Sequence, residues 1–260
     1  MRLVPHIVQR EYLGRLIYGG GDDVLAMLPV ADLLPAAARL RDAWSGVSRF
    51  APLDKDDSLR RKLQLEKGHA LLDGDLLLRT MGARATASAG LIVAHHQTPL
   101  TRVLRELRAA ERVAKEQGGR DALHIRVLKR SGGDLNLTLK WDQLAVFQRL
   151  LAFLREPGVS RRAVYHCLQW LRDLPEPGGD GEMVAQLLGY QFRRQAGGKT
   201  TANAHDVERL AADIARLAVG RDQALDWTGN FLSVAEFLAR ETRATDRQHP
   251  ADDKPEGEAA

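Results

Sequence analysis

Two adjacent carboxylates, Asp22 and Asp23, are the residues with the clearest chemical potential, and they directly follow the glycines at 19–21. Neighbouring acids repel each other, by about 1 kcal/mol at 4 Å in water and about 4 kcal/mol at a surface-like effective dielectric. Each glycine adds a cost in backbone entropy on folding. Folding alone would need fewer such residues, so the stretch predicts a ligand. A divalent cation, Mg²⁺ or Mn²⁺, would relieve the repulsion, because such ions bind one or two carboxylates together with substrate phosphates.

Two ions held about 3.5–4 Å apart can activate a hydroxyl group and stabilise a leaving pyrophosphate. The apolar runs on either side, residues 6–19 and 22–29, are predicted to be two β-strands of a hairpin whose turn carries the acids. Consecutive strand residues point to opposite faces of a sheet. Asp22 and Asp23 can therefore serve one site only if the turn twists the backbone, which the glycines permit, or if one of them contributes its carbonyl.

The clearest predicted helix covers residues 98–117. Thr98 is its expected N-cap, Pro99 its first residue, and Gly118 with Gly119 its end. Its apolar residues recur at helical spacing and form one face: Leu100, Val103, Leu104, Leu107, Ala110 and Ala114.

The other elements of the first half are less regular, and residues 47–80 are mixed, with a charge-dense segment at 54–62 that is predicted to be an exposed insertion. The expected elements are a helix at 30–44 containing Pro35, a strand at 85–96, and strands at 121–130 and 135–141. The resulting order is strand, strand, helix, strand, helix, strand. A ferredoxin-like sheet needs a further strand and helix before such a hairpin. Either the sheet is smaller than usual or the N-terminal part of the protein is missing.

From Trp141 onward the sequence predicts helices separated by segments that contain Gly and Pro. These helices are expected at 141–155, 160–173, 182–195, 203–219 and 224–242. The predicted fold class is therefore α+β. Residues 1–140 form a partial ferredoxin-like palm, 141–242 an all-α helical bundle, and 243–260 a disordered tail.

Bulk composition sets further bounds. The 260 residues carry a net charge of +4, and residues 100–130 hold nine Lys/Arg against four Asp/Glu, as expected of a segment that faces an anionic ligand or of a solvated helix face. Cys167 is the single cysteine, which excludes an intramolecular disulfide and fits a reducing cytoplasm. No run approaches the roughly 18 apolar residues that cross a membrane, so no membrane role is predicted.

The hairpin, the 85–96 strand and the 98–117 helix together resemble the palm-type nucleotidyl cyclase superfamily, which includes the GGDEF diguanylate cyclases. In that superfamily a Gly-Gly-acid-acid hairpin precedes a Ser-x-Gly strand and a helix that closes on Ala-Lys-x-x-Gly-Arg/Lys-Asn. The matching positions are Gly20, Gly21, Asp22, Asp23, Ser88, Gly90, Ala114, Lys115, Gly118 or Gly119, and Arg120. Asp121 stands where Asn is usual.

The finer match is to the large, palm-containing subunit of type III CRISPR-Cas effector complexes, most closely its type III-B (Cmr) form, in the second palm domain and the helical domain after it. This resemblance implies an antiviral enzyme that makes cyclic oligoadenylates from ATP within a complex of further subunits, guide RNA and target RNA. Asp22 and Asp23 would hold the metal ions and Lys115 would meet the triphosphate. The residues Gly20, Gly21, Ser88 and Gly90 would contact the nucleotide, with Ser88 near the base. Arg108 and Arg112 share the stripe of Lys115 by i, i+4, i+7 spacing, as phosphate contacts or as a solvated basic face.

The departures from the family pattern limit these expectations. No counterpart of the usual first palm strand, with its own acid, precedes the hairpin, and the nuclease domain, first palm and zinc region are also absent. The chain is therefore interpreted as a C-terminal portion, from a split gene or a truncation, that synthesises nothing alone. A diguanylate cyclase is one alternative, disfavoured by Val24 in place of Phe and by the helical domain. A nucleotide-binding scaffold without turnover is the other.

Three further motifs are given ordinary structural interpretations. His205-Asp206 is predicted to open a helix and not to form a nuclease site. Residues 195–201 lack the first glycine of a phosphate-binding loop and are predicted to be a plain loop. His95 and His96 are expected to point apart in a surface or strand-end role. The aromatic residues of the helical region are predicted to be core: Trp141, Phe147, Tyr165, Trp170, Phe192, Trp227 and Phe231.

Overall fold

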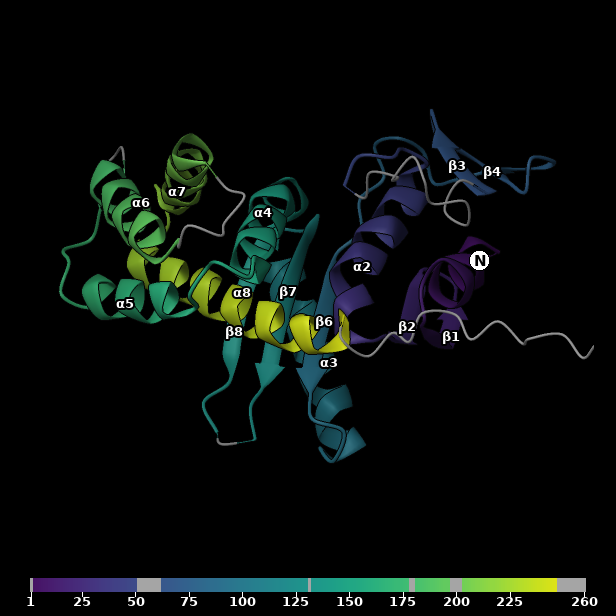
Figure 1. Cartoon of the computed structure of the whole chain (residues 1–260). Helices are drawn as coiled ribbons and strands as arrows, with labels where there is room; N and C mark the ends of the chain where they lie inside the picture. The colour runs from purple at the N-terminus through teal and green to yellow at the C-terminus, as the bar shows by residue number, and fades with distance from the viewer. Residues whose placement is uncertain (1, 51–61, 131, 178–180, 197–202, 247–260) are drawn as a thin grey trace, which may run out of the picture.

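The N-terminal segment of the chain is helical before it becomes a hairpin (Figure 1). In this computed structural model, which describes residues 2–50, 62–130, 132–177, 181–196 and 203–246, a short helix α1 (Leu3–His6) and a π-helical turn η1 (Ile7–Glu11) lead into antiparallel strands β1 (Arg15–Gly20) and β2 (Asp23–Met27). The predicted strand over 6–19 is therefore wrong in its first half. The buried residues there are His6, Ile7, Val8, Glu11 and Tyr12, a helical and not an alternating spacing.

Helix α2 (Val30–Ser45) follows β2 directly, as predicted, and contains Pro35. Gly46 ends it in the left-handed conformation, with φ of +69°. A three-stranded antiparallel sheet comes next, which the sequence analysis missed: β3 (Leu63–Glu66), β4 (His69–Leu72) and β5 (Leu76–Arg79). Its strands have four residues each, too few for alternation to stand out, although the Asp73-Gly74 turn is a hairpin signal. The predicted insertion at 54–62 lies almost wholly outside the described residues.

A second three-stranded sheet packs against helix α3, the helix that bears Lys115. Strand β6 (Ala89–Ala94) pairs in parallel with β7 (Ala122–Leu128) through the crossover helix α3 (Leu100–Glu116), and β8 (Leu135–Lys140) pairs antiparallel with β7. The predicted strands and helix are confirmed, but the expected N-cap is wrong. Pro99 occupies that position in an extended conformation, and its carbonyl accepts the backbone N–H of Arg102 and Val103.

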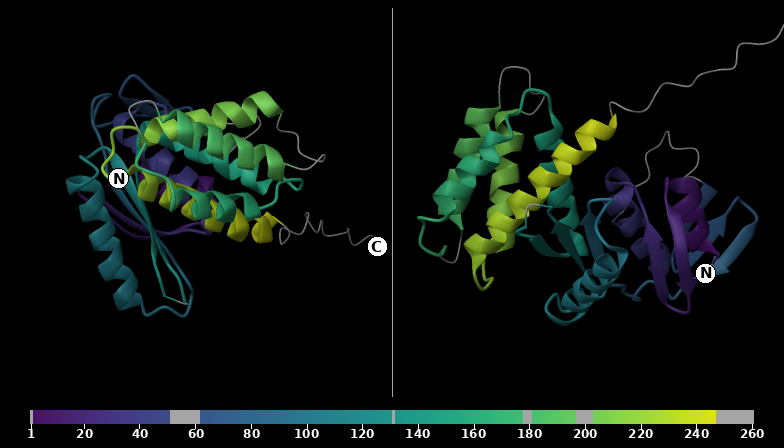
Figure 2. Two further views of the ribbon diagram at one scale, coloured as in Figure 1. Left: turned by 90° about the vertical axis from the view of Figure 1, so that its left-hand side faces the viewer. Right: turned by 90° about the horizontal axis from the view of Figure 1, so that it is seen from below.

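The second half is helical, as predicted. After a 3₁₀ turn (Trp141–Gln143), the helices are α4 (Leu144–Arg155), α5 (Arg162–Leu171), α6 (Glu182–Gln195), α7 (Ala204–Ala218) and α8 (Ala224–Asp246). Helix α8 extends through 243–246, which were predicted to belong to the tail; the rest of that tail lies outside the described residues. The right view of Figure 2 shows the helical group and the N-terminal hairpin at opposite ends of the molecule. Helix α8 contacts both β8 and α2, the helix that follows the hairpin.

One hydrophobic core runs through the sheet of β6–β8 and the helices that cover it. It joins Ile125 and Leu139 of the sheet to Phe147 and Phe231 of α4 and α8. The prediction of core aromatics is wrong for two residues, because Tyr165 and Trp170 are 57% and 45% exposed. They lie on the outer face of α5, whose core face is formed by Ala163, Val164, Cys167 and Leu171. Within the described part of the chain, every helix is too short or too polar to cross a membrane.

Candidate functional site

The acidic turn is a tight two-residue hairpin loop. Gly20 pairs with Asp23 across the ladder, which leaves Gly21 and Asp22 as the loop. Gly21 has φ of +59° and Asp22 has no positive φ, the pattern of a type II′ turn, which favours glycine at its first central position. Asp22 is therefore a turn residue and only Asp23 belongs to a strand, so the alternation of strand side chains does not separate the two carboxylates. Both are exposed.

Lys115, in the last turn of α3, has a pKa that is affected by the charges of Asp22 and Asp23. The pKa of its ammonium group is raised, first by a hydrogen bond of 2.6 Å to Glu111 and then by the charges of Glu111, Asp23 and Asp22, while partial burial acts in the opposite direction. Water screens charges over about 8–10 Å. The hairpin and the Lys-bearing helix, the two halves of the sequence signature, therefore lie within electrostatic reach of each other, although the direct partner of Lys115 is Glu111.

The chemistry of the donors at the turn suits a hard divalent cation. Across the described residues, no ion pair within 4 Å involves Asp22 or Asp23, so their oxygens are not committed to a protein cation. The same part of the chain holds no group of three or more His, Cys, Asp or Glu residues that could enclose a metal. Two carboxylates leave most coordination positions of Mg²⁺ to water and phosphate oxygens, as is usual for Mg²⁺ at nucleotide sites.

Ser88 and Gly90 flank the start of β6. Ser88 immediately precedes the strand and is half-buried. Gly90 lies against the backbone of α3, where an added Cβ would come within 2.6 Å of the Glu111 nitrogen and 2.8 Å of the Leu107 oxygen. The structure gives Gly90 a packing role that the sequence analysis missed, and its predicted contact with nucleotide stays a prediction.

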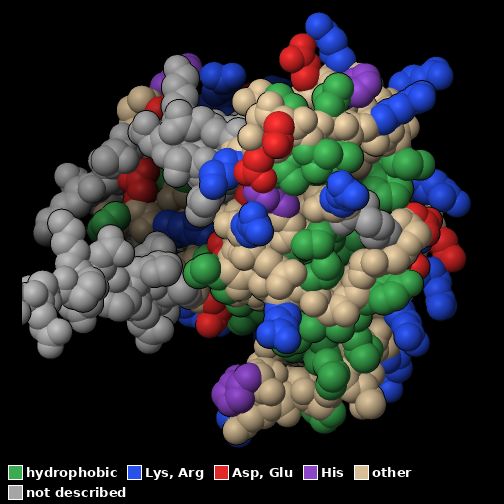
Figure 3. Space-filling view, turned by 90° about the vertical axis from the view of Figure 1, so that its right-hand side faces the viewer, with side chains coloured by type: hydrophobic (Ala, Val, Ile, Leu, Met, Phe, Trp, Pro, Cys, Tyr) green, Lys and Arg blue, Asp and Glu red, His purple; other side chains and the backbone are tan. Residues whose placement is uncertain are grey.

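Gly20 also has a neighbour that the motif did not reveal. A Cβ at Gly20 would overlap the phenol group of Tyr18, which lies on the same face of β1. Tyr18 is 56% exposed, and Ile17 and Met27 of the same hairpin are exposed too. The side of the molecule that carries the hairpin shows apolar side chains beside Lys and Arg side chains (Figure 3). Such a mixed surface next to the acidic turn can take an aromatic or apolar group of a ligand.

Arg108 and Arg112 project from the exposed face of α3, opposite the face buried by Ala110 and Ala114. Together with Arg105 they line a shallow groove of about 440 Å³. The structure therefore places both predicted phosphate contacts on one surface with an additional arginine, and both expectations for them, phosphate contact and solvated face, stay open at this point.

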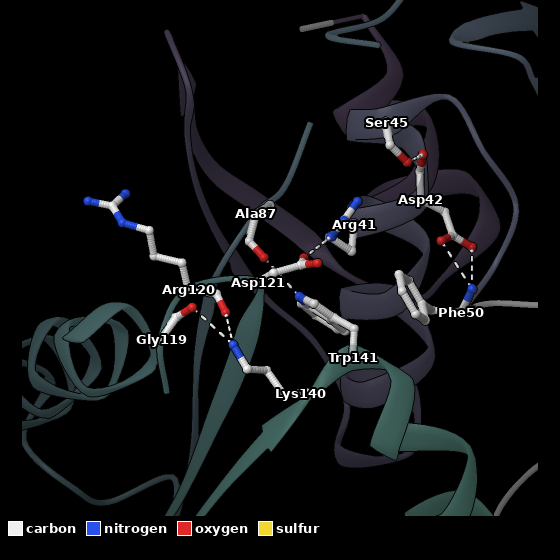
Figure 4. Close-up of polar contacts among 10 residues, drawn as sticks. All are labelled: Arg41, Asp42, Ser45, Phe50, Ala87, Gly119, Arg120, Asp121, Lys140 and Trp141. Atoms are coloured by element: carbon white, nitrogen blue, oxygen red, sulfur yellow. Dashed lines mark hydrogen bonds and ion pairs between the residues drawn. The ribbon is translucent and has the colours of Figure 1, made fainter. Parts of the chain in front are cut away.

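A polar cluster behind the site was not foreseen (Figure 4). Arg41 Nε donates to Asp121 Oδ1 at 2.6 Å, which joins α2 to the turn after α3. In that turn Gly119, Arg120 and Asp121 all have positive φ. Lys140 Nζ donates to the carbonyls of Gly119 and Arg120, at 2.9 and 2.6 Å. The side chain of Arg120 points away from these contacts. The cluster holds three successive left-handed residues that are unfavourable without support.

The same cluster reaches the start of the helical region. The indole N–H of Trp141 donates to the Ala87 carbonyl at 2.8 Å, one residue before Ser88. Phe50 packs near Trp141, with ring centroids 6.2 Å apart, and its backbone N–H donates to the carboxylate of Asp42. No short sequence pattern signals the contacts of Trp141 with Ala87 and Phe50, because they join residues from distant parts of the chain.

The other motifs have structural roles. Asn203 caps α7 by accepting the backbone N–H of Asp206, so the predicted helix start at His205-Asp206 is confirmed. His95 and His96 are exposed directly after β6, so the predicted surface or strand-end role is confirmed. The expectation that their side chains point apart is wrong, since the ring centroids are 4.2 Å apart. Most of the predicted loop at 195–201 lies outside the described residues.

A Gly-Gly-Asp-Asp hairpin next to a lysine on a helix that crosses over a parallel strand pair defines a palm of the nucleotidyl cyclase type. The family model for the second palm domain of Cas10/Cmr2 matches residues 2–124. The chain is 30% identical over 193 residues to the CRISPR system Cmr subunit Cmr2 of Pyrococcus furiosus, an alignment that covers 72% of this chain and 19% of that relative. The chain belongs to the Cas10/Cmr2 family, in agreement with the resemblance found in the sequence, and it spans about a fifth of the length of the curated relative.

Proposed function

We propose that this chain contributes the acidic half of an ATP-dependent nucleotidyl transfer site, which makes cyclic oligoadenylates as part of a type III CRISPR effector complex. The observation that carries the proposal is the Gly-Gly-Asp-Asp turn, whose two carboxylates make no ion pair among the described residues and lie within electrostatic reach of Lys115 on α3. This is the charge arrangement that a metal-bound triphosphate requires.

In the proposed site Asp22 and Asp23 would hold Mg²⁺ or Mn²⁺, which would lower the pKa of a ribose hydroxyl and stabilise the charge of the leaving pyrophosphate. Lys115 donates to the triphosphate, and its hydrogen bond with Glu111 orients the ammonium group beforehand. The ribose hydroxyl loses its proton to solvent water, its oxygen forms a bond to the α-phosphorus of ATP, and the bond between that phosphorus and pyrophosphate breaks. Ser88, at the entry of β6, is the proposed contact to the base.

Two carboxylates and one lysine do not enclose a substrate, and the hairpin is exposed on its outer side. We therefore expect the 260-residue chain to bind metal and nucleotide weakly and to make no product alone. Product formation is proposed to need further subunits of the complex, together with guide RNA and target RNA. Oligoadenylate synthesis from ATP and Mg²⁺ by the chain alone would contradict this part of the proposal.

The test has a binding arm and an activity arm. Titration of Mn²⁺ into the chain, followed by electron paramagnetic resonance, should detect bound ions in wild type and lose them in Asp22→Asn/Asp23→Asn. In a reconstituted complex, the same double variant should assemble normally and lose ATP-dependent product by at least about 100-fold. Asp206→Asn, which removes an exposed carboxylate in α7, is the matched control.

Unchanged product in the double variant would refute the enzymatic proposal and favour a scaffold that binds nucleotide without turnover. Product made from GTP instead of ATP would favour the diguanylate cyclase alternative. Lys115→Gln separates metal binding from triphosphate binding. We expect it to leave the uptake of Mn²⁺ intact and to weaken the binding of ATP.

A further inference from the structure

Helix α3 carries a second feature, a groove on its outward face that the palm signature does not include. The groove has a volume of about 440 Å³ and is lined by Thr101, Leu104, Arg105, Arg108, Ala109 and Arg112. These positions follow i, i+3, i+4, i+7, i+8, i+11 spacing and so form one stripe along the helix. The opposite stripe, with Ala110 and Ala114, is buried against the sheet.

The positive charge of this groove is only partly neutralised by the protein. Among the described residues, Arg108 and Arg112 make no ion pair or hydrogen bond. Arg105 contacts Glu106 at 3.1 Å, but that carboxylate has a closer partner, the guanidinium of Arg126 at 2.6 Å. Like charges three or four residues apart destabilise a helix by about 0.2–0.5 kcal/mol per pair. A bound anion would relieve the repulsion among these arginines, so the stripe favours an anionic ligand.

The stripe runs toward the proposed catalytic site. Lys115, the proposed triphosphate contact, follows Arg112 by three residues, less than one turn further along α3. At a rise of 1.5 Å per residue, the distance from Arg112 to Arg105 along the axis is about 10 Å. That length accommodates successive phosphates of an extended single strand and exceeds the length of one triphosphate. Leu104 and Ala109 supply apolar surface between the guanidinium groups, which suits the sugar and base edges of a strand.

We propose that this groove binds the phosphodiester backbone of a linear, single-stranded oligoadenylate, the intermediate that grows from the acidic turn before it is cyclised. The inference rests on the proposed function, which defines where such a chain is made. Arg105, Arg108 and Arg112 each pair with a backbone phosphate, so that the intermediate is retained between successive additions.

Binding of a fluorescently labelled linear tetraadenylate to the full chain, measured by anisotropy over a range of KCl concentrations, tests the groove. We expect Arg105→Gln/Arg108→Gln/Arg112→Gln to weaken binding about tenfold and to reduce the slope of log K against log[salt] by about 2, since each phosphate contact on a single strand contributes about 0.7. The matched control is Arg172→Gln/Arg194→Gln/Arg209→Gln, which removes three exposed arginines of the helical region. It should change neither quantity appreciably.

An equal effect of the two triple variants would overturn the inference, because binding would then follow net charge and not the groove. Absence of tetraadenylate binding by the wild-type chain would overturn it too. Mn²⁺ binding, measured on the same variants, reports separately on the acidic turn. Suppose that the groove variant loses tetraadenylate binding while the wild-type chain takes up no Mn²⁺. That result would support the groove and would count only against the proposed function.

Discussion

Arg41 Nε lies 2.6 Å from Asp121 Oδ1 and joins α2 to the turn that follows α3. Helix α2 continues directly from the hairpin of Asp22 and Asp23, and the turn follows directly after the helix that carries Lys115. The ion pair therefore links the two elements whose separation sets the geometry of the candidate site. The Arg41 side chain is only 5% exposed, whereas that of Asp121 is 36% exposed.

Asp121→Ala should destabilise the fold by about 1–3 kcal/mol. Breaking a fully buried pair costs about 3–5 kcal/mol, and the partial exposure of Asp121 reduces this. Urea unfolding measures the change. Glu116→Ala, which removes an exposed carboxylate five residues earlier, is the control and should lie within about 0.5 kcal/mol of wild type. Equal stability of the two variants would show that the pair does not hold α2 against the turn.

Gly90→Ala should also destabilise the protein, by about 1–3 kcal/mol, because the new methyl group would overlap the backbone of α3 at Glu111 and Leu107. Neither backbone atom can move without displacing the helix. Gly189→Ala in α6 is the matched control, since its Cβ would find the nearest atom at 3.7 Å. That change should raise stability by up to about 1 kcal/mol through helix propensity. Thermal unfolding of both variants measures the difference in stability. A Gly90→Ala variant as stable as wild type would contradict the packing role of Gly90.

Cys167 should be inert in the folded protein. The thiol is fully buried in α5, and burial raises its pKa to about 12. Since the thiolate is the reactive form, the native chain should react with a thiol reagent such as DTNB only as fast as it unfolds. Denaturant should release the full reaction. Rapid labelling of the native chain would contradict the packing of α5 described here.

Local signals in the sequence were sufficient for the acidic hairpin, the crossover helix and the helical second half. A glycine-rich turn between apolar runs and an apolar face at helical spacing are each encoded within about 20 residues. The same reasoning assigned residues 6–11 to a strand, because their apolar residues fit either period until burial is known. It missed β3–β5, whose strands have only four residues.

Contacts between distant residues could not be predicted in the same way. The pairing of Arg41 with Asp121 and the donation of Lys140 to the carbonyls of Gly119 and Arg120 depend on the tertiary arrangement. The exposure of Trp170 likewise depends on which face of α5 meets the core. The basic groove on α3 was visible in part, since Arg108 and Arg112 shared a predicted stripe. The participation of Arg105, and the absence of ion pairs at Arg108 and Arg112 among the described residues, required the structure.

Stability should fall as the pH decreases below about 7, because two buried histidines favour the neutral form. Burial lowers the pKa of His6 and of His124, against the raising effect of Glu11 on His6 and of side-chain hydrogen bonding on His124. The unfolded chain, with an ordinary pKa of 6.5, then binds more protons than the fold. The stabilisation from the neutral imidazoles is complete above that value and is lost as the pH falls through it, by up to about 1.4 kcal/mol per pH unit for each imidazole.

Urea unfolding between pH 5 and 8 measures this dependence. The free energy of unfolding should vary less with pH for His124→Gln and for His6→Gln, whereas His205→Gln, at an exposed position, is the control. Profiles of equal slope in all three variants would refute this origin of the acid sensitivity.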